Sequence, residues 1–184
     1  VTDGYDFINR GIASQTSAQV LQRFSAHVVP LDPDIIVIQV GINDLKTIGL
    51  FPEQAEDIMS AYQANMRALV ALAQQETEAT VVVSTILPAG DVTWARRLVW
   101  SDAIDQAVIE MNESLKTRAN GTDVFIFDGF SLIAAATAES GRSAYYKDEL
   151  HFTQLGYDLL NEPLLALLRS LPPVDQTPAD QTPD

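Results

Sequence analysis

The chain has only two histidines, and one of them, His151, follows an acidic residue at a spacing that suits acid–base chemistry. Asp148 lies three residues before it, so in a turn the carboxylate can reach Nδ1 of the imidazole and fix its tautomer. Nε2 would then be free to act as a general base. Taken alone, a D-x-x-H pattern is more typical of a surface loop with a helix-capping aspartate. His27 has no acid placed beside it at the end of an expected helix, and we interpret it as structural or solvated.

Asn43 and Gly11 are candidates for a second chemical role, the stabilisation of a negatively charged oxygen. Asn43 follows an apolar run in G-I-N-D, and Gly11 lies in N-R-G-I. An amide or a backbone N–H can donate to an oxyanion, and losing such a donor has cost enzymes about 2.7–4 kcal/mol. Both residues are also ordinary turn residues, since Asn side chains bond to local backbone and Gly permits tight turns.

The composition limits what these residues could act on. The chain has 184 residues, with 11 Lys and Arg against 25 Asp and Glu, a formal net charge of −14 and a pI near 4.3. Such a surface repels phosphate backbones and anionic membranes, so we expect no nucleic-acid partner. No apolar run approaches the roughly 20 residues that span a bilayer. The lack of cysteine excludes disulfides, thiolate zinc sites and a cysteine nucleophile.

Apolar periodicity predicts an alternation of strands and helices. We expect strands at residues 5–12, 35–40, 80–85 and 124–127. We expect helices at residues 17–28, 52–73, 104–115, 131–138 and 153–171. Strands separated by such helices indicate an α/β fold with a mostly parallel, doubly wound sheet. Ligands bind such sheets outside the carboxyl ends of the strands, where the polar and glycine residues of this chain collect.

We expect residues 1–171 to form a single domain. Residues 172–184 are rich in Pro and Asp and have nothing apolar to bury, a composition typical of a disordered tail or linker. The first methionine is Met59, so we expect that a cleavage site or further residues precede Val1. The sequence therefore indicates no cellular compartment, and it indicates no oligomeric state either.

The motifs resemble those of the SGNH (GDSL-type) hydrolases. That family carries a GDS serine, a glycine, a G-x-N-D asparagine and a C-terminal D-x-x-H in this chain order, and the last three are present here. The resemblance runs from about Tyr5 to Leu168. It implies a flavodoxin-like, three-layer α/β/α fold and the hydrolysis of carboxylic esters through an acyl-enzyme. It implies no cofactor and no metal.

Residue by residue, the resemblance implies one set of roles. His151 would deprotonate the serine and later protonate the leaving alcohol, and Asp148 would orient His151. The N–H of Gly11 and the side chain of Asn43 would form the oxyanion hole. Asp44 looks more like a loop brace than a catalyst.

The serine block of the family is missing from the chain. In the family's fold its strand lies in the middle of the sheet, and a sheet without it would expose two buried edges. We therefore expect the nucleophilic serine upstream of Val1. Ser14 and Ser17 follow the glycine block, but as substitute nucleophiles they are disfavoured because serines after a strand more often cap the next helix.

Two other functions stay open besides a serine esterase. One is a catalytically inactive SGNH-like binding domain without the nucleophile. The other is a flavodoxin- or receiver-like domain, which the lack of a phosphate-cradling glycine loop disfavours. The sequence does not choose among acyl ester, thioester and O-acetyl carbohydrate substrates. Residues 91–102 hold Trp94 and Trp100 and could line a substrate pocket, or Trp94 could pack on the sheet with Arg96 and Arg97 in solvent.

Overall fold

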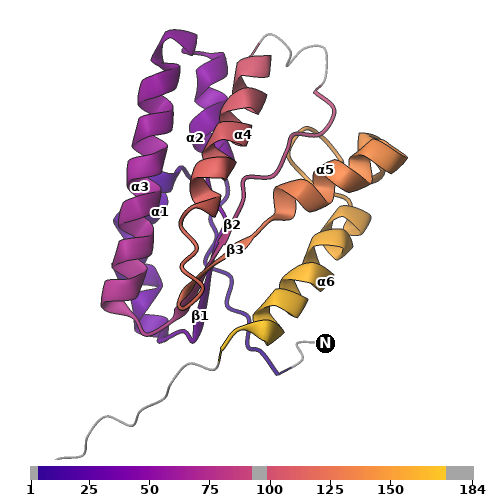
Figure 1. The fold of residues 1–184 in the computed structure, drawn as a ribbon. Coiled ribbons are helices and arrows are strands. Elements are labelled where there is room, and N and C mark those ends of the chain that lie inside the picture. The colour runs from indigo at the N-terminus through magenta and orange to yellow at the C-terminus, as the bar shows by residue number, and fades with distance from the viewer. Residues whose placement is uncertain (1–3, 93–98, 173–184) are drawn as a thin grey trace, which may run out of the picture.

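A parallel sheet lies between two layers of helices (Figure 1). The structure is a computed structural model, and it describes residues 4–92 and 99–172. Within these residues the sheet has the order β1-β2-β3, and its strands are β1 (Ile35–Ile38), β2 (Thr80–Ser84) and β3 (Val124–Phe127). All pairs are parallel, with Val37 beside Val82 and Val82 beside Phe125. The architecture confirms the α/β/α fold class.

The helices connect the strands and cover both faces of the sheet. They are α1 (Ser17–His27), α2 (Ile42–Leu45), α3 (Ala55–Glu76), α4 (Asp102–Lys116), α5 (Gly129–Ser140) and α6 (Gln154–Ser170). Short 3-10 turns lie at Val29–Leu31, Lys46–Gly49, Pro52–Gln54 and Arg142–Ala144. Figure 1 shows α1, α3 and α4 on one side of the sheet and α5 and α6 on the other. No helix in the described part of the chain is long and apolar enough to cross a bilayer.

Alternation along the strands divides the core into two parts. Val81 and Val83 belong to the larger apolar cluster, which α1, α3 and α4 complete. Val82, between them, belongs to the smaller cluster with residues of α5 and α6. All three side chains are fully buried, as expected of a parallel strand covered on both faces.

The sheet has an uncovered edge at β1. In the described residues β1 pairs with β2 only, so its other edge has no strand beside it. Val37 is 42% exposed, whereas Val82, its neighbour in register, is fully buried. The second helical layer thus covers β2 but leaves part of β1 open.

The strand predicted at residues 5–12 is wrong. This segment has no regular secondary structure, although it keeps the exposed apolar side chains Phe7, Ile8 and Ile12. A strand exists only through hydrogen bonds to a neighbouring strand, and among the described residues none lies beside this segment. Its alternating apolar residues are those of a strand, but the pairing that would form one is absent.

A buried asparagine attaches the loop after β2 to α4. Asn112 is 2% exposed, its Oδ1 accepts the N–H of Ile86 at 2.7 Å, and its Nδ2 donates to the carbonyl of Ile86 at 2.9 Å. The Asn112 side chain therefore satisfies both the backbone N–H and the backbone C=O of Ile86, as a paired strand does within a sheet.

Replacing Asn112 with alanine should lower the free energy of unfolding by about 2–4 kcal/mol, because it leaves a buried N–H and a buried C=O of Ile86 unpaired. Urea unfolding followed by circular dichroism measures the loss. Gln106→Ala, on the exposed face of the same helix, is the matched control and should cost less than about 0.5 kcal/mol. Equal losses in the two variants would contradict this account of Asn112.

Candidate active site

The loop that carries D-E-L-H is attached to the carboxyl end of the sheet. The N–H of Gly90, in the loop after β2, donates to the carbonyl of Glu149 at 3.0 Å. The hydroxyl of Tyr146 donates to the carbonyl of Pro88 in the same loop. Tyr146 also pairs with Phe152 in an isolated antiparallel bridge, with ring centroids 4.6 Å apart. These contacts hold the segment at the edge where α/β sheets bind ligands.

Asp148 and His151 are in direct contact. Nδ1 of His151 lies 2.8 Å from Oδ2 and 3.0 Å from Oδ1 of Asp148. Oδ1 also accepts the backbone N–H groups of Leu150 and His151, at 2.9 and 2.8 Å. Asp148 therefore closes a tight turn within its own loop, whereas Thr153 caps the following helix. The imidazole side chain is 73% exposed, and no described residue hydrogen-bonds to its Nε2.

Hydrogen bonds keep Asp148 ionised. The backbone N–H groups of Leu150 and His151, together with the imidazole of His151, lower the pKa of Asp148 to about 2. A charged carboxylate that contacts Nδ1 fixes the orientation of the imidazole ring and leaves Nε2 facing solvent.

Because the backbone N–H groups are the larger cause, His151→Ala should leave the pKa of Asp148 below its usual 3.8 while raising it above the wild-type value. A carboxyl ¹³C NMR titration measures both midpoints. The contribution of this carboxylate to folding is full above pH 3.8 and is lost as the pH falls through about 2. A midpoint at or above 3.8 in the variant would contradict this ranking of causes.

Asp44 braces the start of α1. Its carboxylate accepts the N–H of Ser17 at 2.9 Å and the hydroxyl of Ser17 at 2.5 Å. Nδ2 of Asn65, on α3, donates to the same hydroxyl at 3.0 Å. Burial raises the pKa of Asp44 and the bonds from Ser17 oppose that rise. Because Ser17 is 1% exposed and its hydroxyl is already bonded, it is not placed as a nucleophile.

Asn43, in α2, and Gly11 both form hydrogen bonds to the segment at residues 9–15. Nδ2 of Asn43 donates to the carbonyl of Gln15 at 3.0 Å, which leaves its second N–H for another acceptor. The N–H of Gly11 donates to Oδ1 of Asn9 at 2.8 Å. Within residues 4–92 and 99–172, no hydrogen bond joins either residue to the Asp148–His151 pair.

Other candidates from the sequence are placed as follows. Ser14 is exposed and has a positive φ of 64°. Trp100 is partly buried against the larger cluster and its Nε1 donates to Asp105 at 3.2 Å. Trp94, Arg96 and Arg97 lie outside the described residues. The described residues contain no group of three or more His, Asp or Glu side chains arranged to hold a metal ion.

Comparison with known proteins places this chain in a family. The model of the GDSL-like lipase/acylhydrolase family matches residues 2–159. A protein from Bacteroides fragilis assigned as an acylhydrolase is 27% identical, with a TM-score of 0.70 over 91% of this chain and 76% of its own. A GDSL-like lipase from Bacteroides thetaiotaomicron is 25% identical, with a TM-score of 0.67 over 89% and 76% of the two chains.

The same fold occurs in an acetylxylan esterase from Geobacillus stearothermophilus. That structure is 20% identical to this chain, with a TM-score of 0.62 over 86% of this chain and 70% of its own. Among curated proteins, none matches the sequence. The family match covers most of the chain and confirms the resemblance that the three sequence motifs indicate.

Proposed function

The chain belongs to the GDSL-like lipase/acylhydrolase family, whose members hydrolyse esters, and from this premise we propose that it is a serine esterase acting through an acyl-enzyme. One observation carries the proposal. The carboxylate of Asp148 contacts Nδ1 of His151 at 2.8 Å, and the described residues leave Nε2 unpartnered in solvent. An oriented imidazole with a free Nε2 is the acid–base half of a serine triad.

In the proposed reaction, a serine hydroxyl attacks the ester carbonyl and gives its proton to Nε2 of His151. The tetrahedral oxyanion accepts hydrogen bonds from the free N–H of the Asn43 amide and from the N–H of Gly11. Collapse of the intermediate releases the alcohol, which takes the proton back from Nε2. Water then repeats the sequence on the acyl-serine and frees the acid. Asn9 must first release the N–H of Gly11, to which it is bonded in this structure.

The uncovered edge of β1 supports a position for the nucleophile. An unpaired strand edge with exposed apolar side chains is a surface on which another strand can pair. Val37 on β1 is exposed, and so are Phe7, Ile8 and Ile12 of the 5–12 segment. We propose that a strand upstream of Val1 pairs with β1 and ends in the serine. Its carboxyl end would then lie beside Gly41 and Asn43, which follow β1.

The proposed substrates are uncharged esters with small or medium acyl groups. A net charge of −14 disfavours anionic lipid surfaces. Hydrolysis of p-nitrophenyl esters from acetate to decanoate would define the acyl length.

The proposal is tested by labelling the full-length protein, including residues upstream of Val1, with a fluorophosphonate probe and mapping the adduct by peptide mass spectrometry. We expect one adduct, on a serine upstream of Val1, and its loss in His151→Ala. His27→Ala, which removes the other histidine, should label like the wild type. An adduct on Ser14 would move the nucleophile to that loop. No adduct on the folded protein would overturn the esterase and favour the inactive binding domain.

A further inference from the structure

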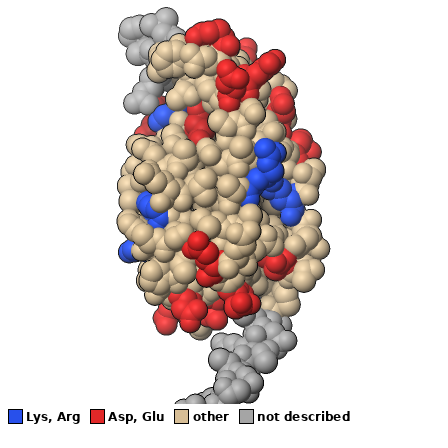
Figure 2. All heavy atoms as spheres, turned by 90° about the vertical axis from the view of Figure 1, so that its left-hand side faces the viewer, with Lys and Arg blue, Asp and Glu red and all other residues tan. Residues whose placement is uncertain are grey.

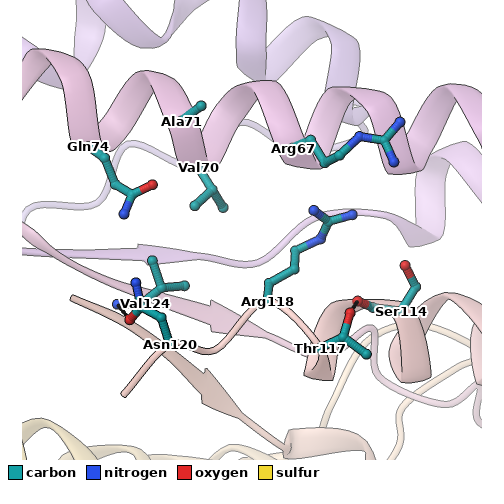
Figure 3. A pocket seen from close by; sticks show the side chains of 9 residues that line it. All are labelled: Arg67, Val70, Ala71, Gln74, Ser114, Thr117, Arg118, Asn120 and Val124. Carbon is teal, nitrogen blue, oxygen red and sulfur yellow. Dashed lines mark hydrogen bonds between the residues drawn. The ribbon is translucent and has the colours of Figure 1, made fainter. Parts of the chain in front are cut away.

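A cavity of about 440 Å³ lies between α3 and the turn that follows α4. Figure 3 shows Arg67 reaching this cavity from α3 and Arg118 reaching it from the turn after α4. Val124, the first residue of β3, forms part of its wall. The cavity is therefore at the amino end of β3, whereas the Asp148–His151 loop contacts the loop at the carboxyl end of β2. The cavity and the Asp148–His151 pair therefore lie at opposite ends of the parallel strands.

The guanidinium of Arg118 has unused hydrogen-bonding capacity. Its Nε is buried and has no hydrogen-bond partner within the described residues. Its Nη2 donates to the carbonyl of Gln63 at 3.5 Å, which is long for a hydrogen bond. A guanidinium carries five N–H donors, and a buried donor without an acceptor is unfavourable. An acceptor that reached this N–H would remove the cost.

Neither Arg67 nor Arg118 forms a salt bridge with an acid among the described residues. Asp123 does not line the cavity, and its carboxylate accepts hydrogen bonds from two residues that do, Gln74 and Asn120. Burial and the charge of Arg67 both lower the pKa of Arg118, which indicates that the two positive groups are close enough to repel each other.

We propose that this cavity binds a phosphate group, as the free ion or within a phosphate monoester, between Arg67 and Arg118. Two guanidinium groups match the charge and the oxygen geometry of a phosphate dianion. The hydroxyl of Ser114 lines the same cavity and has no hydrogen-bond partner among the described residues. Val70, Ala71 and Val124 form the apolar part of the wall, and of these Ala71 is partly exposed to an organic group on the phosphate. Figure 2 shows a compact basic patch on the α1–α3 side of the molecule, where acidic side chains gather toward both ends.

Isothermal titration of the full-length protein with inorganic phosphate at constant ionic strength tests the proposal. We expect Arg118→Gln and Arg67→Gln each to weaken phosphate binding by about tenfold or more. Lys46→Gln removes one positive charge outside the cavity and should bind phosphate like the wild type. Equal affinities in the wild type and Arg118→Gln would overturn the proposal, and so would an equal loss in Lys46→Gln.

Thermal unfolding separates binding from a structural role of Arg118. In chloride, Arg118→Gln should be no less stable than the wild type, because the substitution removes an unpaired donor and a repulsion. In phosphate, the wild type should gain melting temperature and the variant should not. A loss of the same size in both salts would overturn the proposal. Tighter binding of phenyl phosphate than of phosphate would assign a monoester, and equal binding would assign the free ion.

Discussion

Replacing His151 with alanine should lower kcat for ester hydrolysis by roughly 10⁴-fold or more, with a much smaller change in KM. The variant loses the group that accepts the serine proton and returns it to the leaving alcohol, so the loss falls on the chemical step. The side chain is 73% exposed and makes no core contact, so the free energy of unfolding should change by less than about 1 kcal/mol. Steady-state kinetics on p-nitrophenyl acetate, with a denaturation curve for each protein, separate the two effects.

Asp148→Asn and His27→Ala complete this experiment. The asparagine variant keeps the size of the side chain but removes the negative charge that contacts Nδ1 of His151, and a comparable change has cost a serine enzyme about 10⁴-fold in kcat. His27→Ala removes the histidine at the end of α1 and should retain the wild-type rate. A wild-type rate in His151→Ala would exclude His151 as the base, and a large loss in His27→Ala would point to a nonspecific effect.

The sequence predicts the contact between Asp148 and His151 in the candidate site. Asp148 and His151 lie three residues apart in one turn, so their contact depends on local geometry that a spacing can indicate. The same holds for the strand at Val124–Phe127, where a short β-branched and aromatic run has the bounds expected of it. Where a contact is local, a single sequence contains the information needed to predict it.

The rest of the site depends on contacts between distant segments. Asp44 bonds to Ser17, 27 residues away, and Asn65 joins them from α3. No periodicity or spacing marks Asn65, which is a polar residue on a helix that the apolar pattern predicts equally well without it. The bond from Asn43 to Gln15 is of the same kind. A single sequence does not encode these partners in any pattern, because packing decides them.

The error at residues 5–12 has a different cause. The apolar pattern of that segment describes which side chains could be buried, but not whether a partner strand is present. In the sheet, the same lack of a partner strand among the described residues leaves one edge of β1 unpaired, and Val37 on that strand is exposed. Secondary structure that depends on pairing cannot be predicted for one segment without its neighbour.

Replacing Gly41 with alanine should lower the free energy of unfolding by about 2–6 kcal/mol. Gly41 has a φ of 139°, which side-chain-bearing residues rarely adopt and which costs roughly 1–3 kcal/mol. A Cβ there would also lie 2.7 Å from Cδ1 of Ile86 and 2.8 Å from Cε2 of Tyr62. Tyr62 is 1% exposed and cannot move away without disturbing the larger cluster, so overpacking adds roughly 1–3 kcal/mol.

Gly121→Ala is the matched control for the backbone part of this loss. Gly121 has a φ of 73°, but a Cβ there would meet no atom within 4 Å. Its variant should therefore show the cost of a positive φ without a clash, and the excess loss at Gly41 combines its less accessible φ with the overpacking. Adding Ile86→Val to Gly41→Ala removes the closest clashing atom and should recover part of the stability. Equal losses at Gly41 and Gly121 would show that Ile86 and Tyr62 move away from the added Cβ at no cost. Close packing at Gly41 would then not hold the G-I-N-D turn in place.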